Sequence, residues 1–180
     1  MSVSWPPDPI RTARLVLREP EARDRAAFVE LSASPEVNTY LGGPRPQDEL
    51  DRVPEVPGRR PGVFVVDLGG TMIGAVMLVR RELGPPGRGR PEVDLGYLFR
   101  PGAWGHGYAA EACAAAHDWF AGAHPGEPVA LYTQTANERS MRLAAKLGFT
   151  EVERFEKWDA EQWFGVWRGL EAGGVERGLE

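Results

Sequence analysis

The chain has 180 residues and carries 26 acidic against 21 basic side chains, which gives a formal net charge of −5. That length suits one domain with a sizeable core. The acidic balance argues against nucleic acid as a partner, because neutralising a phosphate backbone needs many positive charges. Cys113 is the only cysteine and the three histidines show no ligand spacing, so we expect neither an intrachain disulfide nor a metal site.

The sequence also predicts where the protein works. No apolar run approaches the length of a membrane span. The opening residues MSVSWPPDPI lack the basic-then-apolar pattern of a signal peptide. We therefore expect a cytoplasmic protein with no membrane partner, present as a monomer or a homodimer.

The first half of the chain predicts a strand, a helix and a hairpin. Residues 13–19 alternate and place Leu15 and Leu17 on one face, which is typical of a strand. Apolar residues recur at roughly helical spacing over 21–40, and a short helix is expected within 47–53. The runs VFVVDL and TMIGAVMLV are joined by two glycines and predict a β-hairpin.

The middle of the chain predicts a strand, a helix and a second strand. Residues 93–99 read as a strand in which Gly96 marks a bulge or a close backbone approach. A helix is expected from Tyr108 to about Ala121, because its apolar residues recur at i, i+3, i+4 and i+7. A strand is expected at 129–135.

The last part of the chain predicts a short helix and a closing hairpin. The helix covers 137–149, with Asn137 as its N-cap and Gly148 just past its end. The alternating runs FTEVERFE and WFGVWRGL would pair as the hairpin. The fold class is therefore mixed α/β (α+β), with a largely antiparallel central sheet flanked by helices and one crossover through the helix at 108–121.

The segment RPGAWGHGYAAEA, residues 100–112, runs from proline and glycines directly into good helix formers. The N-terminus of a helix has unpaired amides and a partial positive charge, and it attracts anions. Glycines before it allow positive φ and a close backbone approach. Gly105 and Gly107 therefore predict a phosphate cradle, with a loose turn as the alternative. The segment lacks the Lys-Ser/Thr pair of a P-loop and the third glycine of a dinucleotide fingerprint.

Three segments in order, RTARLVLRE, VDLGYLFRPGAWGHGYAAEA and NERSMRLAAKLGF, resemble the GNAT acetyltransferases. More narrowly, they resemble the subgroup that includes the ribosomal-protein N-terminal acetyltransferases. The resemblance extends from about Arg11 to Trp167. It implies a single N-acetyltransferase domain over 1–180 with its core at about 11–168, and a GNAT fold in which a splayed central strand pair holds acyl-CoA.

The resemblance also implies how acetyl-CoA, the acyl donor, would bind without a metal. The family's phosphate loop, R/Q-x-x-G-x-G/A, has its glycines on Gly105 and Gly107, while Gly102 departs from the pattern at the Arg/Gln position. Loop amides would bind the pyrophosphate, and the pantetheine arm would lie against the central strand like an extra strand. Asn137, in an N-x-x-S pattern completed by Ser140, would contact the pantetheine or thioester region. The implied cofactor-binding residues are Tyr97, Leu98, Phe99, Trp104, Gly105, His106, Gly107, Tyr108, Ala109 and Asn137.

Acetyl transfer to an amine needs a proton acceptor, a stabilised oxyanion and a proton for the leaving thiolate. The resemblance implies Asp94 as the candidate base, acting directly or through water, because many relatives of the subgroup carry an acidic residue at this place on the central strand. Glu92 is its competitor, and a strand carboxylate paired with an arginine is the alternative. Ser140 is the candidate donor to the sulfur, unless it only supports the first turn of its helix. Tyr132 and Tyr108 are alternative phenolic acids.

The expected function is N-acetylation of a primary amine by direct attack on acetyl-CoA in a ternary complex. The acceptor would be a protein N-terminus, an amino acid or an amine-bearing small molecule. The alternative is a catalytically inactive CoA-binding regulatory or scaffold protein. The acceptor site is expected across the sheet from CoA, near 20–45 and 155–165. An apolar wall is expected there from Tyr40, Trp158, Trp163 and Phe164.

Overall fold

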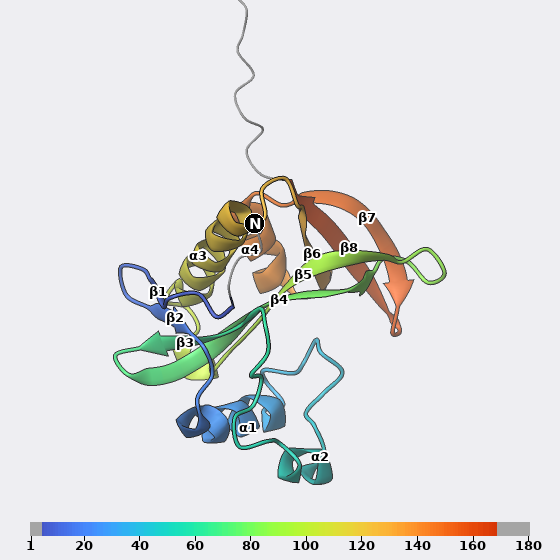
Figure 1. The fold of residues 1–180 in the computed structure, drawn as a ribbon. Coiled ribbons are helices and arrows are strands. Elements are labelled where there is room, and N and C mark those ends of the chain that lie inside the picture. The colour runs from blue at the N-terminus through green and yellow to red at the C-terminus, as the bar shows by residue number, and fades with distance from the viewer. Residues whose placement is uncertain (1–4, 169–180) are drawn as a thin grey trace, which may run out of the picture.

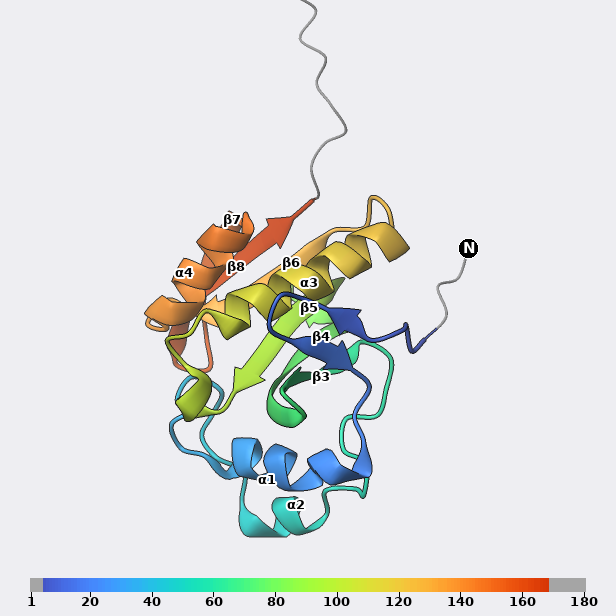
Figure 2. The same cartoon turned by 90° about the vertical axis from the view of Figure 1, so that its left-hand side faces the viewer.

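The computed structural model describes residues 5–168 and folds them into an eight-stranded sheet with helices on both faces (Figure 1, Figure 2). The strands lie in the order β1-β2-β3-β4-β5-β6-β8-β7. The strand bounds are β1 Ile10–Arg11, β2 Val16–Arg18, β3 Val63–Leu68, β4 Thr71–Leu83, β5 Arg90–Phe99, β6 Val129–Gln134, β7 Thr150–Lys157 and β8 Ala160–Trp167. The α-helices are α1 Arg25–Ala33, α2 Gln47–Asp51, α3 Tyr108–Ala123 and α4 Glu138–Leu147, and the 3-10 turns are η1 Ala22–Asp24 and η2 Pro101–Ala103.

The predicted fold class is confirmed. Neighbouring strands are antiparallel throughout this sheet except for β5 and β6, which are parallel and are connected through α3. In Figure 1 and Figure 2, α3 and α4 cover one face of the sheet and α1, with α2 beside it, lies on the other. The main core fills the α3 side, and a smaller cluster around Leu31 of α1 packs against Val65 on the opposite face.

The predicted strand at 13–19 forms as β2, and Leu15 and Leu17 are both buried as expected. The predicted hairpin of β3 and β4 also forms, with its turn held by Asp67, whose Oδ1 accepts a 2.7 Å hydrogen bond from the amide of Gly70. The helical spacing over 21–40 forms α1 from Arg25 to Ala33, and this helix ends just before Pro35, where the sequence pattern breaks.

A buried ion network fixes the entry of α1 to the sheet. Arg18 of β2 donates hydrogen bonds of 2.8 and 2.9 Å to Asp24 and one of 3.0 Å to Asp67 of β3. The amide of Glu21 donates a further 2.8 Å bond to Asp24. Since an unpaired buried charge is costly, these contacts hold the start of α1 in one position over the strands.

The bulge predicted at Gly96 is wrong. β4 and β5 pair continuously from Gly74↔Phe99 to Leu83↔Arg90, with Gly96 opposite Met77. A Cβ at Gly96 would lie 3.4 Å from the Cε of Met77. That is an ordinary van der Waals distance, so Gly96 lies in a regular strand pair beside the end of the Met77 side chain.

The central strands β5 and β6 separate soon after they meet. Their parallel pairing covers only Val93↔Val129 and Asp94↔Ala130. Beyond that point β5 stays paired to β4 as far as Phe99, and β6 stays paired to β8 as far as Gln134. The facing edges of the two strands therefore lack a strand partner in the described part of the chain, which is the splayed pair that the sequence implied.

The helices α3 and α4 form close to their predicted bounds. On α3, the predicted stripe is buried at Ala112, Cys113, Ala116 and Phe120, and α3 ends two residues later than expected. On α4, the predicted caps are confirmed in a set of local contacts: Asn137 Oδ1 accepts from the Ser140 amide at 3.3 Å, and Gly148 has φ +87°. Among residues 5–168, no helix combines the length and apolar character that crossing a bilayer requires.

The sequence did not predict the burial of His117, which lies on α3 at 4 % exposure. Its ring centre is 3.4 Å from that of Trp167, and its Nε2 has no hydrogen-bond partner among the described residues. Burial lowers the pKa of His117 below its usual 6.5, although Asp118 partly opposes this. The imidazole is therefore neutral in the fold at neutral pH.

We expect acid to destabilise the protein through His117. Below pH 6.5 the unfolded chain binds a proton that the fold excludes, so the free energy of unfolding should fall with pH, by at most about 1.4 kcal/mol per pH unit. Urea unfolding of a His117→Gln variant between pH 7 and 5 should lack this component of the slope. The control His124→Gln, at an exposed histidine, should keep it. A His117→Gln slope equal to that of the parent protein would contradict the expectation.

Candidate functional site

The glycine loop between β5 and α3 has the backbone geometry of an anion cradle. Gly105 and Gly107 have φ of +81° and +79°, and Gly107 is the N-cap of α3. No side chain of the described chain caps the amides of the first turn. A Cβ at Gly105 would meet no described atom within 4 Å, and one at Gly107 would meet only Arg14, at 3.5 Å. The loop is therefore open to an approaching anion.

Arg14, just before β2, holds this loop in place. Its Nη1 donates a 2.9 Å hydrogen bond to the carbonyl of His106, and its Nε lies 3.3 Å from Glu111 on α3. Its guanidinium lies 4.5 Å from the ring centre of Tyr108, and the exposed His106 ring stacks on that same tyrosine. Sequence reasoning missed Arg14, because 97 residues separate it from Glu111 and no local pattern links them.

A second arginine approaches the loop from α4. Trp104 is fixed by a 2.9 Å hydrogen bond from its Nε1 to the carbonyl of Phe99. The guanidinium of Arg139, which the sequence did not single out, lies 4.5 Å from the Trp104 ring centre. Positive charge from two distant segments thus borders the glycines, although Gly102 lacks the family's side chain.

The side of β5 that faces α3 brings Tyr97, Ser140 and Asn137 together. The hydroxyl oxygens of Tyr97 and Ser140 are 2.5 Å apart, and Asn137 caps the helix that carries Ser140. Burial raises the pKa of Tyr97 to about 12, against the opposing effect of the Ser140 hydrogen bond. Sequence reasoning assigned Tyr97 only a backbone role, since its hydroxyl contact depends on the docking of α4.

Asp94 lies on the other side of β5, in the face that carries α1. It is 3 % exposed, and its Oδ2 accepts from both Nε (2.6 Å) and Nη2 of Arg81. Its Oδ1 has no partner among the described residues. Burial raises the pKa of Asp94, and the charge and hydrogen bonds of Arg81 oppose this without reversing it. The ion pair with an arginine that the sequence analysis gave as the alternative is therefore present, between Arg81 and Asp94. The Asp94 carboxylate in this pair is nevertheless more basic than usual.

The remaining sequence-predicted residues divide between the two faces. Leu98 packs against the α1 cluster, and Ala109 is partly buried against the main core. The competitor Glu92 is half-buried and lies opposite Arg81 in the strand register. Tyr108 belongs to the glycine loop on the α3 side, away from the face that carries Asp94.

The predicted apolar wall needs one correction. Trp163 lies in the main core on the α3 side, because it is opposite Thr133 in the register and therefore points away from Asp94. Phe164 does lie on the face of Asp94, and Trp158 is 70 % exposed nearby at the β7–β8 turn. Tyr40 is partly exposed, and its carbonyl accepts a hydrogen bond from Gln134.

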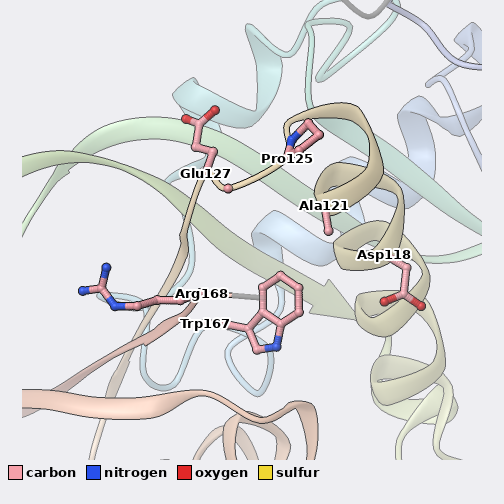
Figure 3. A pocket seen from close by; sticks show the side chains of 7 residues that line it. Asp118, Ala121, Pro125, Glu127, Trp167 and Arg168 are labelled. Carbon is pink, nitrogen blue, oxygen red and sulfur yellow. The ribbon is translucent and has the colours of Figure 1, made fainter. Parts of the chain in front are cut away.

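Two surface hollows lie away from these groups. One, of about 360 Å³, lies at the C-terminal end of α3, where Trp167 points toward the helix and Arg168 away from it (Figure 3). The other, of about 350 Å³, lies between α1 and Arg100. Neither hollow is lined by Asp94 or by the glycine loop.

Comparison with known proteins agrees with this geometry. The model of the acetyltransferase (GNAT) domain matches residues 14–150. The chain therefore belongs to the GNAT acetyltransferases, a family of acyltransferases that use acetyl-CoA. It is 27 % identical over 156 residues to the uncharacterized protein YkkB of Bacillus subtilis (strain 168), covering 82 % of this chain and 88 % of YkkB.

Solved structures share the fold. An acetyltransferase from Agrobacterium tumefaciens is 27 % identical with a TM-score of 0.73, over 94 % of this chain and 99 % of that one. RimL, a ribosomal alpha-N-protein acetyltransferase solved in complex with coenzyme A, has a TM-score of 0.69 at 15 % identity, over 89 % of this chain and 98 % of its own. At that identity RimL shows the fold alone.

Two of the buried aspartates, Asp24 and Asp94, provide a stability test of the site. Burial alone would raise the pKa of Asp24, but hydrogen bonds from Arg18 and the Glu21 amide outweigh it and lower that pKa, whereas the pKa of Asp94 is raised. We expect Asp94→Asn to raise the unfolding midpoint at pH 7, because the fold no longer buries that charge and Arg81, 61 % exposed, stays solvated. Asp24→Asn should cost about 3 kcal/mol, because it breaks a buried pair.

Denaturant unfolding of both variants measures this difference. The gain from Asp94→Asn should shrink as the pH falls through the raised pKa, because Asp94 then becomes neutral in the parent protein. A loss of stability similar to that of Asp24→Asn would instead identify Asp94 as an ordinary structural ion pair.

Proposed function

We propose that the chain is an N-acetyltransferase that moves the acetyl group of acetyl-CoA to a primary amine by direct attack in a ternary complex. The parting of β5 from β6 is the observation that carries the proposal. It leaves unpaired strand edges that lead from Asp94 toward the glycine loop. We further propose one N-acetyltransferase domain over 1–180, with its core at about 11–168.

The donor would lie along this opening. Amides between Trp104 and Ala109 would bind the CoA pyrophosphate, with Arg14 and Arg139 adding positive charge beside them. The backbone of residues 97–99 would hydrogen-bond the pantetheine arm in place of a neighbouring strand. Support comes from the positive φ of the loop glycines, the uncapped first turn of α3 and the missing strand partner along this edge.

The chemistry would use the two faces of β5 separately. An acceptor ammonium first loses a proton to solvent through Asp94, directly or by way of a water. The amine lone pair then attacks the thioester carbonyl carbon, so a C–N bond forms and the carbonyl becomes an oxyanion. When the oxyanion collapses, the C–S bond breaks and the second proton of the nitrogen passes to Asp94. Ser140, oriented by Tyr97, would give its hydroxyl proton to the thiolate and regain one from solvent, while Asp94 releases its own proton to solvent.

The acceptor could be a protein N-terminus, an amino acid or an amine-bearing small molecule. The alternative is a CoA-binding protein without catalysis, and the Arg81–Asp94 ion pair is the observation that favours it. A cytoplasmic location, the absence of a nucleic-acid partner and a monomeric or homodimeric state stay predictions from the sequence.

The glycine loop provides a test of CoA binding with a matched control. We expect Gly107→Val to weaken CoA at least about tenfold, because the side chain would block hydrogen bonds from the loop amides. Gly126→Val is the control, since Gly126 has the same φ of +79° in the turn after α3 and a Cβ there would meet nothing within 4 Å, while one at Gly107 would meet only Arg14, at 3.5 Å. Both variants carry the same backbone strain. Calorimetry showing equal CoA affinity for the two would contradict the proposed cradle.

Thiol release from acetyl-CoA with a panel of amines, peptides and aminoglycosides tests the activity itself. With an active acceptor, Asp94→Asn should lower turnover by about 10² to 10⁴ at neutral pH and leave acetyl-CoA affinity nearly unchanged. The defect should shrink at high pH, where the free amine is already neutral. Asp118→Asn, at an exposed α3 carboxylate, is the control. CoA binding without thiol release for every acceptor would favour the non-catalytic alternative.

A further inference from the structure

Two polar atoms on the face of the sheet that carries α1 are buried without a hydrogen-bond partner among the described residues. They are Asp94 Oδ1 and the hydroxyl oxygen of Tyr132. Buried polar atoms are nearly always hydrogen-bonded, so an unpaired one calls for a ligand or a water. Arg81 does not satisfy Asp94 fully, because both of its contacts go to Oδ2. One carboxylate oxygen is therefore left free.

The two unpaired atoms belong to side chains on the same face of the sheet, two residues apart along the strand direction. Asp94 of β5 is opposite Ala130 of β6, and Tyr132 follows two residues later on the same side as Ala130. The phenol is also close enough for the negative charge of Asp94 to add to the effect of burial, and together they raise the pKa of Tyr132 to about 12. Tyr132 is thus a neutral phenol beside a carboxylate, at the point where β5 and β6 part.

Three aromatic rings from β7, β8 and the turn between them lie around the ring of Tyr132. The ring centre of Tyr132 is 5.5 Å from Phe155, 5.8 Å from Trp158 and 6.4 Å from Phe164. Trp158 remains 70 % exposed, with the ammonium of Lys157 4.6 Å from its ring centre. The surface next to the unpaired oxygens is therefore largely apolar.

We propose that Asp94 Oδ1 and the Tyr132 hydroxyl oxygen together accept the two N–H groups of a neutral primary amine carried on an apolar group, and that this pair selects primary over N-substituted amines. The inference rests on the proposed acetyltransferase function and deepens it. Arg81 already offsets the charge of Asp94, so the pair suits a neutral amine better than an ammonium ion.

This arrangement leaves the amine lone pair free to attack. With one N–H directed at each oxygen, the lone pair points away from both, toward the opening between β5 and β6. When the C–N bond forms, the N–H facing Oδ1 gives its proton to Asp94, and the N–H facing Tyr132 remains in the amide product. An N-methyl amine has a single N–H and would leave one buried oxygen unpaired, which sites of this kind discriminate against strongly.

The test compares a phenylethylamine with its N-methyl derivative, both difluorinated beside the amine carbon so that the neutral form predominates. Calorimetric titration into the CoA-saturated protein should show roughly tenfold or tighter binding of the primary amine, the effect of one buried hydrogen bond. In Tyr132→Phe the ratio should fall to within about twofold, with CoA affinity unchanged. Thr133→Val removes a hydroxyl from the next residue, on the opposite face, and should keep the ratio.

The outcomes separate this inference from the proposed function. Equal binding of the two amines, no binding of either, or a ratio that Tyr132→Phe leaves unchanged would each overturn the inference. Selective binding without thiol release for any amine would reject acetyl transfer and leave the amine geometry standing. Thiol release with an unselective site would support the enzyme and reject the role of Tyr132.

Discussion

Backbone groups that are buried must find hydrogen-bond partners, and β5 and β6 supply one another at only two residue pairs before they diverge. Each strand remains paired on its outer side, to β4 and to β8, and the main core lies beneath them on the α3 side. The free strand edges are where the proposed donor would lie, with the glycine loop at one end, the Tyr97–Ser140 contact on the α3 side and Asp94 on the α1 side.

The alternation of side chains along β5 places the two proposed catalytic groups on opposite faces of the sheet. Because successive side chains of β5 point to opposite faces, Tyr97 meets Ser140 on the α3 side, while Asp94 meets Arg81 on the other. A single strand thus separates the group proposed to serve the leaving sulfur from the group proposed to serve the amine. The groups on one face of β5 cannot replace those on the other face. Only a shift of the strand register by one residue would exchange the two, and it would move every side chain of β5 to the opposite face of the sheet.

The same chain uses buried carboxylates in two different ways. Asp24 is held by Arg18 and a backbone amide, and its charge fixes α1 to the sheet. Asp94 has an exposed arginine on one oxygen only, and burial raises its pKa. Both side chains are 3 % exposed. Hydrogen bonds to the charged form outweigh the effect of burial on the pKa at Asp24 but not at Asp94, so Asp24 stabilises the fold as a carboxylate, whereas Asp94 is the one proposed to transfer a proton.

The sequence by itself determined the elements whose signals are local. Alternation predicted β2 and the closing hairpin of β7 and β8, and two apolar runs joined by glycines predicted the hairpin of β3 and β4. Helical spacing predicted the buried stripe of α3, and Asn137 and Gly148 marked the ends of α4. Glycines against a helix start located the loop with positive φ. Backbone periodicity and capping are properties of neighbouring residues, so they can be read without the fold. The same local interpretation was wrong about a bulge at Gly96, because a glycine in a strand does not by itself determine whether the pairing with the next strand is interrupted.

Only the tertiary structure decided which side chains meet. Arg14 reaches the glycine loop across 92 residues, and Ser140 reaches Tyr97 across 43. The orientation of Trp163 into the core, and of Tyr132 beside Asp94, depends on the registers of β6 with its two neighbours. Contacts of this kind are set by strand register and by the docking of α3 and α4, which no stretch of sequence encodes alone. The candidate base could be named from the family resemblance of its strand, but the partners that give it its chemistry could not.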